Sequence, residues 1–307
     1  FTPGSTGTDP SPTYTVTSSP GSITATGQAI RITSTTTSGG SGIWLTGAVT
    51  GGAVTLISNK ISSTATNVHI AATGLITANS LTVTSSGGLS ATLVSLGAIT
   101  INAGGGNITV TANASAAGSE WGIYQEGTIT NNAAGSNISF ISNNKILTGA
   151  ITLVANNGLP AANIIYDTTA GTKGSSIKSE RLTFTTGANS AINFVMRSSG
   201  AALYIGFIGT STAALPGTVT LDNTYGCTTA PCTPVSGFIT NTNAATLATA
   251  TVGVTVWNAI YAVGDISIKG VSSTLAGVDY YAVINSSSRG ISISGTSVGS
   301  AATAPAG

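Results

Sequence analysis

Short alternations of apolar and polar residues recur along almost the whole chain. The clearest marker is a tetrapeptide in which glycine and one variable residue precede Val or Ile and then Ser or Thr. Eight copies begin at Gly21, Gly47, Gly74, Gly97, Gly127, Gly149, Gly237 and Gly264. Relaxed copies around Ile177, Ile208 and Ile291 fill the gaps. The landmarks therefore return about every 27 residues, and an internal period of that length predicts a repeat architecture.

Each period holds more than one strand pattern. A second apolar ladder lies between the glycine-marked positions, at Val54, Leu81, Ile108 and Ile138. A third apolar segment often precedes the glycine, as at Ile43–Leu45, Val68–Ile70, Thr92–Val94 and Gly122–Tyr124. Three short strands in about 27 residues are typical of one winding of a β-solenoid.

One such winding cannot bury its apolar side chains, whereas stacked windings place them in continuous inward columns. We expect the tetrapeptide to supply one column, formed by Ile23, Val49, Ile76, Ile99, Ile129, Ile151, Ile239 and Ile266. We expect the eight tetrapeptide glycines to form tight corners, where a positive φ or a close backbone approach excludes other residues. The prediction is an all-β chain, a single parallel β-solenoid of about eleven windings, roughly 50 Å long.

The domain organisation follows from where this pattern begins and stops. Residues 1–20 and 300–307 are rich in Pro, Ser, Thr and Ala and suit an extended leader and tail, and residues 21–299 form the solenoid. Residues 211–236 contain three prolines and both cysteines and are expected to project as a loop.

Composition narrows the function classes. The 307 residues include 41% apolar residues but only 9 basic and 8 acidic ones. Because no basic patch can neutralise phosphates, nucleic acid is not an expected partner. The least polar window, residues 244–264, is interrupted by threonines and a glycine, so no transmembrane segment is expected.

Three segments carry a family resemblance: Gly52–Asn59, Gly106–Asn113 and Gly149–Asn157. They resemble the repeats of filamentous-haemagglutinin-type secreted bacterial adhesins and their β-strand-repeat relatives, over roughly two-thirds of the chain. The resemblance implies a right-handed parallel β-helix, export to the bacterial cell surface or the medium, and a role in adhesion or fibre formation. In such an oxidising compartment Cys227 and Cys232, five residues apart, are expected to form a disulfide.

Catalytic chemistry is weakly represented. Glycan-cleaving β-helices need clustered carboxylates, whereas the acidic residues here are scattered, and only Glu120 and Glu126 share a winding. This pair brackets Trp121 and Tyr124, which makes these four residues a candidate glycan contact. The sole histidine, His69, has no Ser, Asp or Cys partner nearby in sequence, so no triad is expected. No metal or cofactor site is expected either.

Threonine pairs raise another alternative. The spacing Thr-x-Thr recurs, for example at Thr82 with Thr84 and Thr109 with Thr111. Flat threonine ladders on solenoids resemble those of ice-binding proteins. Winding lengths that vary from 22 to 31 residues are expected to break such an array, and Thr is in any case a favoured outward strand residue.

The sequence therefore favours a non-enzymatic extracellular structural protein, a subunit of a surface fibre or an adhesin stalk. Solenoid ends expose unpaired backbone groups unless they are capped. We expect the end around Ile291 and Ile293 to stack on the first winding of another copy, with residues 1–20 bridging the joint. Further repeats of the same chain could supply that cover instead. A glycan- or matrix-binding role, a glycan-cleaving role and an ice-binding role remain alternatives.

Overall fold

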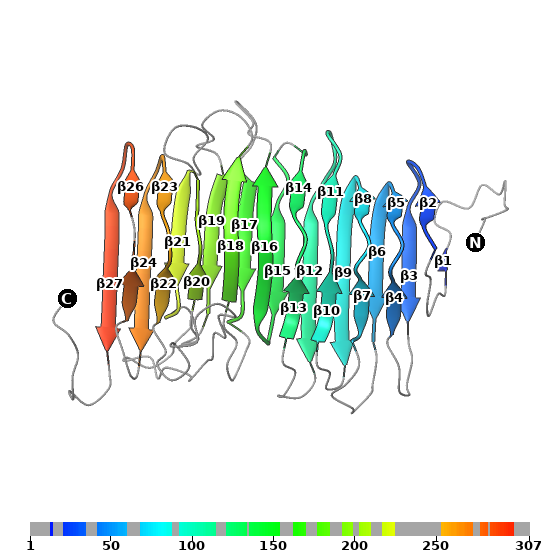
Figure 1. The fold of residues 1–307 in the computed structure, drawn as a ribbon, viewed down its shortest axis with the longest axis horizontal. Helices are drawn as coiled ribbons and strands as arrows, with labels where there is room; N and C mark the ends of the chain where they lie inside the picture. Colours follow the sequence, from blue (N-terminus) through cyan, green and yellow to red (C-terminus); the bar gives the residue numbers. More distant parts are fainter. Residues whose placement is uncertain are drawn as a thin grey trace.

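The computed structural model describes residues 13–14, 21–34, 42–59, 68–87, 92–114, 121–133, 135–153, 162–169, 177–184, 192–198, 203–209, 217–224, 253–272, 277–281 and 283–297. These residues form strands and turns without a helix. All strand pairs in the described ranges are parallel, and the chain advances by one winding at each return (Figure 1). The molecule is an all-β parallel solenoid with a period of about 27 residues, which confirms the predicted fold class.

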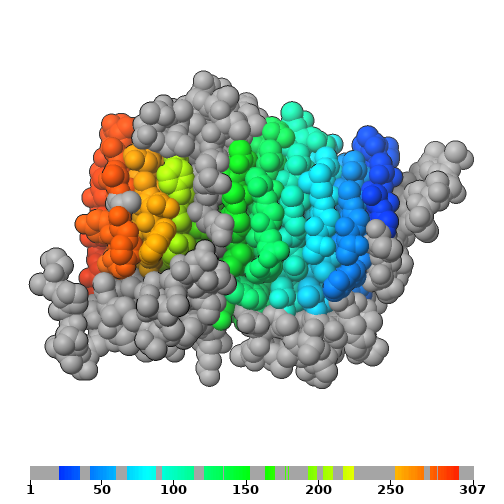
Figure 2. Space-filling view, viewed as in Figure 1, coloured from blue at the N-terminus to red at the C-terminus, as the bar shows by residue number. Residues whose placement is uncertain are grey.

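Face 1 is an eleven-stranded sheet that runs the length of the described stack. Its strands lie side by side in Figure 1, and its described windings form adjacent bands in the space-filling view of Figure 2. In spatial order they are β1 (Thr13–Tyr14), β3 (Ile30–Ser34), β6 (Ala53–Ser58), β9 (Ser80–Gly87), β12 (Ile108–Ala114), β15 (Ile138–Ser142), β17 (Ala162–Asp167), β19 (Ile192–Arg197), β21 (Thr218–Asp222), β24 (Ile266–Ser272) and β27 (Ile291–Ser297).

Face 2 precedes the corner glycines of the tetrapeptide. It stacks β4 (Ile43–Leu45), β7 (Ile70–Ala72), β10 (Thr92–Leu96), β13 (Trp121–Gln125), β16 (Ile146–Leu153), β18 (Ile177–Phe184), β20 (Leu203–Ile205), β22 (Val254–Val256) and β25 (Val278–Tyr280). Most of these strands are short, because the chain turns after three to five residues to begin the next face.

Face 3 follows the corner. It stacks β2 (Ile23–Ala25), β5 (Val49–Gly51), β8 (Ile76–Ala78), β11 (Ile99–Ile101) and β14 (Ile129–Asn131), and continues near the other end as β23 (Ile260–Ala262) and β26 (Ile284–Ser286). The long β16 pairs with both β13 and β14, so it joins faces 2 and 3 in one fourteen-stranded sheet.

The number of complete windings is smaller than the predicted eleven. Six windings give a separate strand to each face within the described residues, namely β4-β5-β6, β7-β8-β9, β10-β11-β12, β13-β14-β15, β22-β23-β24 and β25-β26-β27. In the intervening windings β16 and β18 run straight through the corner between faces 2 and 3, so one strand replaces two.

The core lies where the inward columns of the three faces meet. Six of the predicted column residues lie in register on face 3, from Ile23 through Val49, Ile76, Ile99 and Ile129 to Ile151. All but the first, Ile23, are at most 1% exposed. Burial of each such side chain stabilises the fold by about 1.5–3 kcal/mol, but only when the neighbouring winding is present.

The prediction for Ile266 is wrong. This residue is buried, but it lies on face 1, in register with Val219 and Ile291 rather than above Ile151. The tetrapeptide forms a corner followed by a strand. The same sequence pattern also occurs at the corner before face 1, as at Gly106-Asn107-Ile108-Thr109. The motif therefore marks the start of a strand without specifying its face. Ile239 and Gly237 lie outside the described residues.

Candidate interaction surfaces

The corner glycines between faces 2 and 3 are packed against the backbone of the preceding winding. A Cβ atom on Gly74 would lie 2.8 Å from the carbonyl oxygen of Thr46 and closer still to the carbonyl of Gly47. Gly47 is equally crowded, with the nitrogen of Ser22 at 2.8 Å. Gly97 and Gly127 are confined in the same way, as are Gly149 within β16 and Gly264 at the corner before face 1, whereas Gly21 has open space around it. None of these glycines has a positive φ, so close approach rather than backbone conformation explains the crowded ones.

An asparagine ladder that the sequence reading missed supports the corner before face 1. The Oδ1 of Asn107 accepts from the backbone N–H of Asn137, and the Oδ1 of Asn137 accepts from the N–H of Asn163, each at 2.8 Å. The amide of Asn193 donates to Asn163 at 3.3 Å, and the Thr218 hydroxyl donates to Asn193 at 2.8 Å. The available signal was an asparagine directly before the first inward residue of successive face 1 strands.

The predicted glycan-contact residues mostly make contacts with one another and with Lys145. The rings of Trp121 and Tyr124 lie 5.9 Å apart at 56°, and the Lys145 ammonium lies 5.7 Å from the Trp121 ring centroid. The Tyr124 hydroxyl donates to the carboxylate of Glu126. This cation–π contact and this hydrogen bond use the groups that a sugar would need. Glu120 lies outside the described residues.

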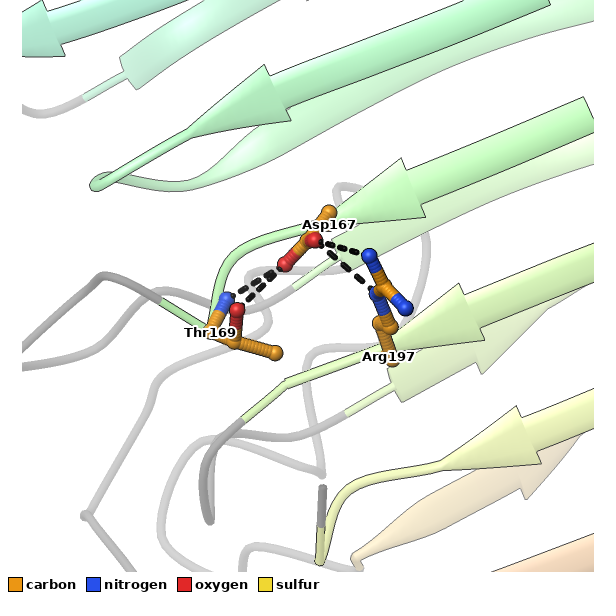
Figure 3. Close-up of polar contacts among 3 residues, drawn as sticks. All are labelled: Asp167, Thr169 and Arg197. Atoms are coloured by element: carbon orange, nitrogen blue, oxygen red, sulfur yellow. Dashed lines mark hydrogen bonds and ion pairs between the residues drawn. The ribbon is translucent and has the colours of Figure 1, made fainter. Parts of the chain in front are cut away.

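A column of alternating charge lies on the outer surface of face 1. Strand register places Asp167, Arg197, Asp222 and Lys269 next to one another on β17, β19, β21 and β24. The Arg197 guanidinium contacts the Oδ2 of Asp167 through Nη2 at 2.7 Å and Nε at 2.9 Å (Figure 3). The other carboxylate oxygen accepts from the N–H and hydroxyl of Thr169 at 2.8 and 2.7 Å.

These contacts decide the protonation of Asp167. Burial raises the pKa of this carboxyl group, but the hydrogen bonds from Thr169 and Arg197 and the Arg197 charge outweigh burial and leave the pKa below its usual value. Asp167 and Asp222 lie two strands apart, which is about 10 Å. A glycan-cleaving pair requires one carboxyl group that holds a proton near neutral pH. The lowered pKa of Asp167 keeps this carboxyl group ionised near neutral pH, so it acts as a structural anion.

A polar bridge crosses the core at the windings where the corner is straightened. The Tyr166 ring stacks on Phe140, its register partner, at 5.1 Å, and lies 5.7 Å from Phe194, which belongs to the neighbouring inward column in register with Ile164. The Tyr166 hydroxyl reaches across to the hydroxyl groups of Thr148 at 2.9 Å and Ser179 at 3.2 Å on face 2. Burial raises the pKa of Tyr166 to about 12, although both hydrogen bonds act in the other direction.

His69 is an interior residue. Its side chain is fully buried, and its Nδ1 lies 3.0 Å from the Ser85 hydroxyl oxygen. Within the described ranges, no three His, Cys, Asp or Glu residues gather in a way that could hold a metal ion. The predicted disulfide pair, Cys227 and Cys232, falls outside those ranges. Among the residues described, no helix has the length and apolarity needed to cross a bilayer.

The C-terminal end of the described stack exposes its apolar columns. Ile266 and Ile268 on β24 are 1% and 0% exposed, whereas their register partners on β27, Ile291 and Ile293, are 45% and 40% exposed. Val283, Tyr280 and Tyr281 in the same winding are each more than half exposed. We call these five residues the end patch. It holds most of the large apolar side chains that are exposed in the described residues.

Threonines line the outer surface of face 3. Thr24, Thr50, Thr77, Thr100, Thr130 and Thr152 lie in register on six successive strands, one per winding. Unequal winding lengths do not interrupt the register of this column. The extra residues lie outside the paired strands, and the strand register is unchanged. We call these six residues the threonine column.

Comparison with known protein families, curated proteins and solved structures found no match for this chain. The β-solenoid class rests on the fold itself, and the structure confirms that much of the family resemblance noted in the sequence.

Proposed function

We propose that the protein is a non-enzymatic structural subunit of an extracellular fibre or adhesin stalk, and that copies join end to end by continuing the solenoid stack. The observation that carries this proposal is the end patch. The same two inward columns that are fully covered at β24 are about half open at β27.

The chemistry of the end patch suits another winding of the same kind. β27 pairs with β24 over seven residues, and its opposite edge offers backbone N–H and C=O groups to a further parallel strand. Ile291 and Ile293 would lie beneath the inward residues of that strand, as Ile266 and Ile268 lie beneath them now. The occupant we propose is therefore the first winding of a second copy.

Two further observations support an extracellular, structural role. The chain carries few charges, and its repeats resemble those of secreted bacterial adhesins. The carboxylate with the best-defined environment, Asp167, is held in its ionised form by Thr169 and Arg197, which is unsuited to general-acid catalysis. Asp167 therefore does not support the glycan-cleaving alternative.

Negative-stain imaging and sedimentation at rising protein concentration test the proposal. Wild type should form filaments, and the double variant Ile291→Lys/Ile293→Lys should remain monomeric because two buried charges cannot be accommodated at the joint. Ile141→Lys is the matched control, since Ile141 is 37% exposed on the side of the rod. It should form filaments as wild type does.

A wild type that stays monodisperse at high concentration would contradict self-assembly and favour the alternative that further repeats of a longer chain cover this end. Loss of filaments in the Ile141→Lys control as well as in the end-patch variant would show that the end patch is not the joint.

A further inference from the structure

The hydroxyl and methyl groups of the threonine column have no role in the proposed end-to-end fibre. Five strands of face 3 are three residues long and have threonine as their one outward residue, and Thr152 on the longer β16 continues the column into a sixth winding. Inside it lies the column of Ile and Val residues, buried from Val49 onward, which fixes the backbone of each strand. The spacing of the threonines is therefore set by strand pairing, at about 4.8 Å per step and about 24 Å over the column.

Strand propensity does not account for this constancy. Other outward positions on the same rod satisfy the preference for β-branched and aromatic residues with several residue types. On face 1 one outward column runs in register through Thr82, Thr109, Ser139, Ile165 and Val195. Only the face 3 position keeps a single residue type through six consecutive described windings.

Five of the six threonines offer their hydroxyl groups to a ligand. Within the described residues, no side-chain hydrogen bond occupies the hydroxyl groups of Thr24, Thr50, Thr77, Thr100 and Thr130. Each hydroxyl can donate one hydrogen bond and accept others, and each carries a methyl group beside it. The surface offers the same pair of groups at every step.

The position two residues before each threonine of the column is uncharged. The variable residue of the tetrapeptide lies beside each threonine and is Ser22, Ala48, Leu75, Ala98, Thr128 or Ala150. The Glu126 carboxylate, at the corner before Gly127, accepts a hydrogen bond from Tyr124. Strand register places Arg181 beside Ala150 at the last winding of the column, so the uncharged positions run from Ser22 to Thr128.

We propose that the threonine column binds a solid surface of ordered water, that is, the face of an ice crystal. A rigid, uncharged line of hydroxyl and methyl groups at one fixed interval fits a lattice that repeats at a fixed interval. The hydroxyl groups form hydrogen bonds with water molecules of the lattice. The methyl groups lie over the spaces between those water molecules. The alternatives fit less well.

A second copy of the same face is the first alternative. A strip about 24 Å long and three residues wide covers far less than the roughly 800 Å² per partner of a stable protein interface. A sugar polymer is the second alternative. Sugar sites use aromatic platforms or grooves with polar groups, and the described part of face 3 from Gly21 to Thr152 has neither an aromatic side chain nor a charge.

Thermal hysteresis and ice-recrystallisation inhibition test the proposal. Both are measured in the Ile291→Lys/Ile293→Lys background, so that filament formation neither adds to the signal nor obscures it. This background protein should shape ice crystals and lower their growth temperature. Adding Thr77→Tyr/Thr100→Tyr should abolish both effects, because the rings lift the surface away from the lattice.

The matched control is Thr82→Tyr/Thr109→Tyr, which places the same rings on adjacent paired strands of face 1 and should leave the activity intact. Thr77→Val/Thr100→Val keeps the shape and the methyl groups while removing hydroxyl groups, and should reduce the activity without changing the circular dichroism spectrum. Absence of thermal hysteresis in the background protein would overturn the proposal. So would equal losses in the face 1 and face 3 tyrosine variants.

Discussion

The windings before β16 and those after it solve the same packing problem by different means. Before β16, each winding has a glycine corner between faces 2 and 3, small aliphatic columns and uncharged outer threonines. From β16 to β21, the corner is straightened in two windings, the inward side chains of face 1 include Tyr166 and Phe194, and the outer surface carries Asp167, Arg197 and Asp222.

The difference shows what a parallel solenoid holds constant. Register on face 1 continues without a break from β3 to β27, although corners, core side chains and surface charges all change along the way. Inward columns and backbone pairing tolerate substitution because each winding needs only a complementary neighbour. The two regions should therefore differ in which single substitutions they tolerate.

The largest effect is expected at the corners of the regular region. Gly74→Val should lower the free energy of unfolding by about 3 kcal/mol, because the new side chain overlaps the backbone of the preceding winding. Gly21→Val is the matched control in the same motif, and with nothing within 4 Å of its Cβ position it should change stability by less than about 0.5 kcal/mol. Urea unfolding followed by circular dichroism measures both. Equal losses would show that crowding at the corner is not the cause.

A smaller effect is expected in the core of the irregular region. Tyr166→Phe should cost about 1–2 kcal/mol, because the buried Thr148 and Ser179 hydroxyl groups lose their partner. Burial raises the pKa of Tyr166 from 10.0 to about 12. The unfolded chain therefore ionises first as the pH rises, so wild type loses stability between about pH 10 and pH 12.

The Tyr166→Phe variant should lack this part of the alkaline loss, so the stability curves of variant and wild type converge as the pH rises through that window. Urea midpoints at intervals from pH 9 to pH 12 measure the convergence. Curves that stay parallel would contradict a buried, neutral Tyr166.

The smallest effect is expected on the charged surface. Asp167 and Asp222 make the same turn, with Thr169 and Thr224 respectively, at nearly equal distances. Asp167 also has the close ion pair with Arg197, in which the side chains are 13% and 30% exposed. Asp167→Asn should therefore cost more than Asp222→Asn by no more than about 1 kcal/mol, since partly exposed pairs are weak.

The sign of the pH dependence follows from the lowered pKa of Asp167. Its stabilising contribution is present above the ordinary Asp pKa and disappears as the pH falls below about 4. Thermal unfolding of wild type and Asp167→Asn should therefore differ at pH 7 and converge in acid. A difference that persists at pH 2, or that is unaffected by high salt, would contradict this account.

Much of the architecture was accessible from sequence. The period, the all-β class, the parallel solenoid and the column from Ile23 to Ile151 follow from the spacing of glycine and β-branched residues, because each winding repeats the same local problem. The placement of Ile266 was not accessible, since a glycine corner precedes strands on both face 1 and face 3. The loss of the corner in β16 and β18 was likewise not predicted from the local sequence.

The candidate surfaces were less predictable. Trp121, Tyr124 and Glu126 do lie together, as expected from residues in one strand and its adjoining corner. The pair of Asp167 and Arg197 joins residues 30 apart, and the bridge from Tyr166 to Ser179 joins different faces. Neither follows from a pattern within one winding.

By itself, the sequence determined which residues point inward and how often the chain returns, because alternation within a strand and recurrence between windings are properties of local spacing. The tertiary structure decided which residue of one winding lies on which residue of the next. That register depends on how many residues each corner contains, and it brings unequal windings together into a continuous threonine column, a charge ladder and an open apolar end.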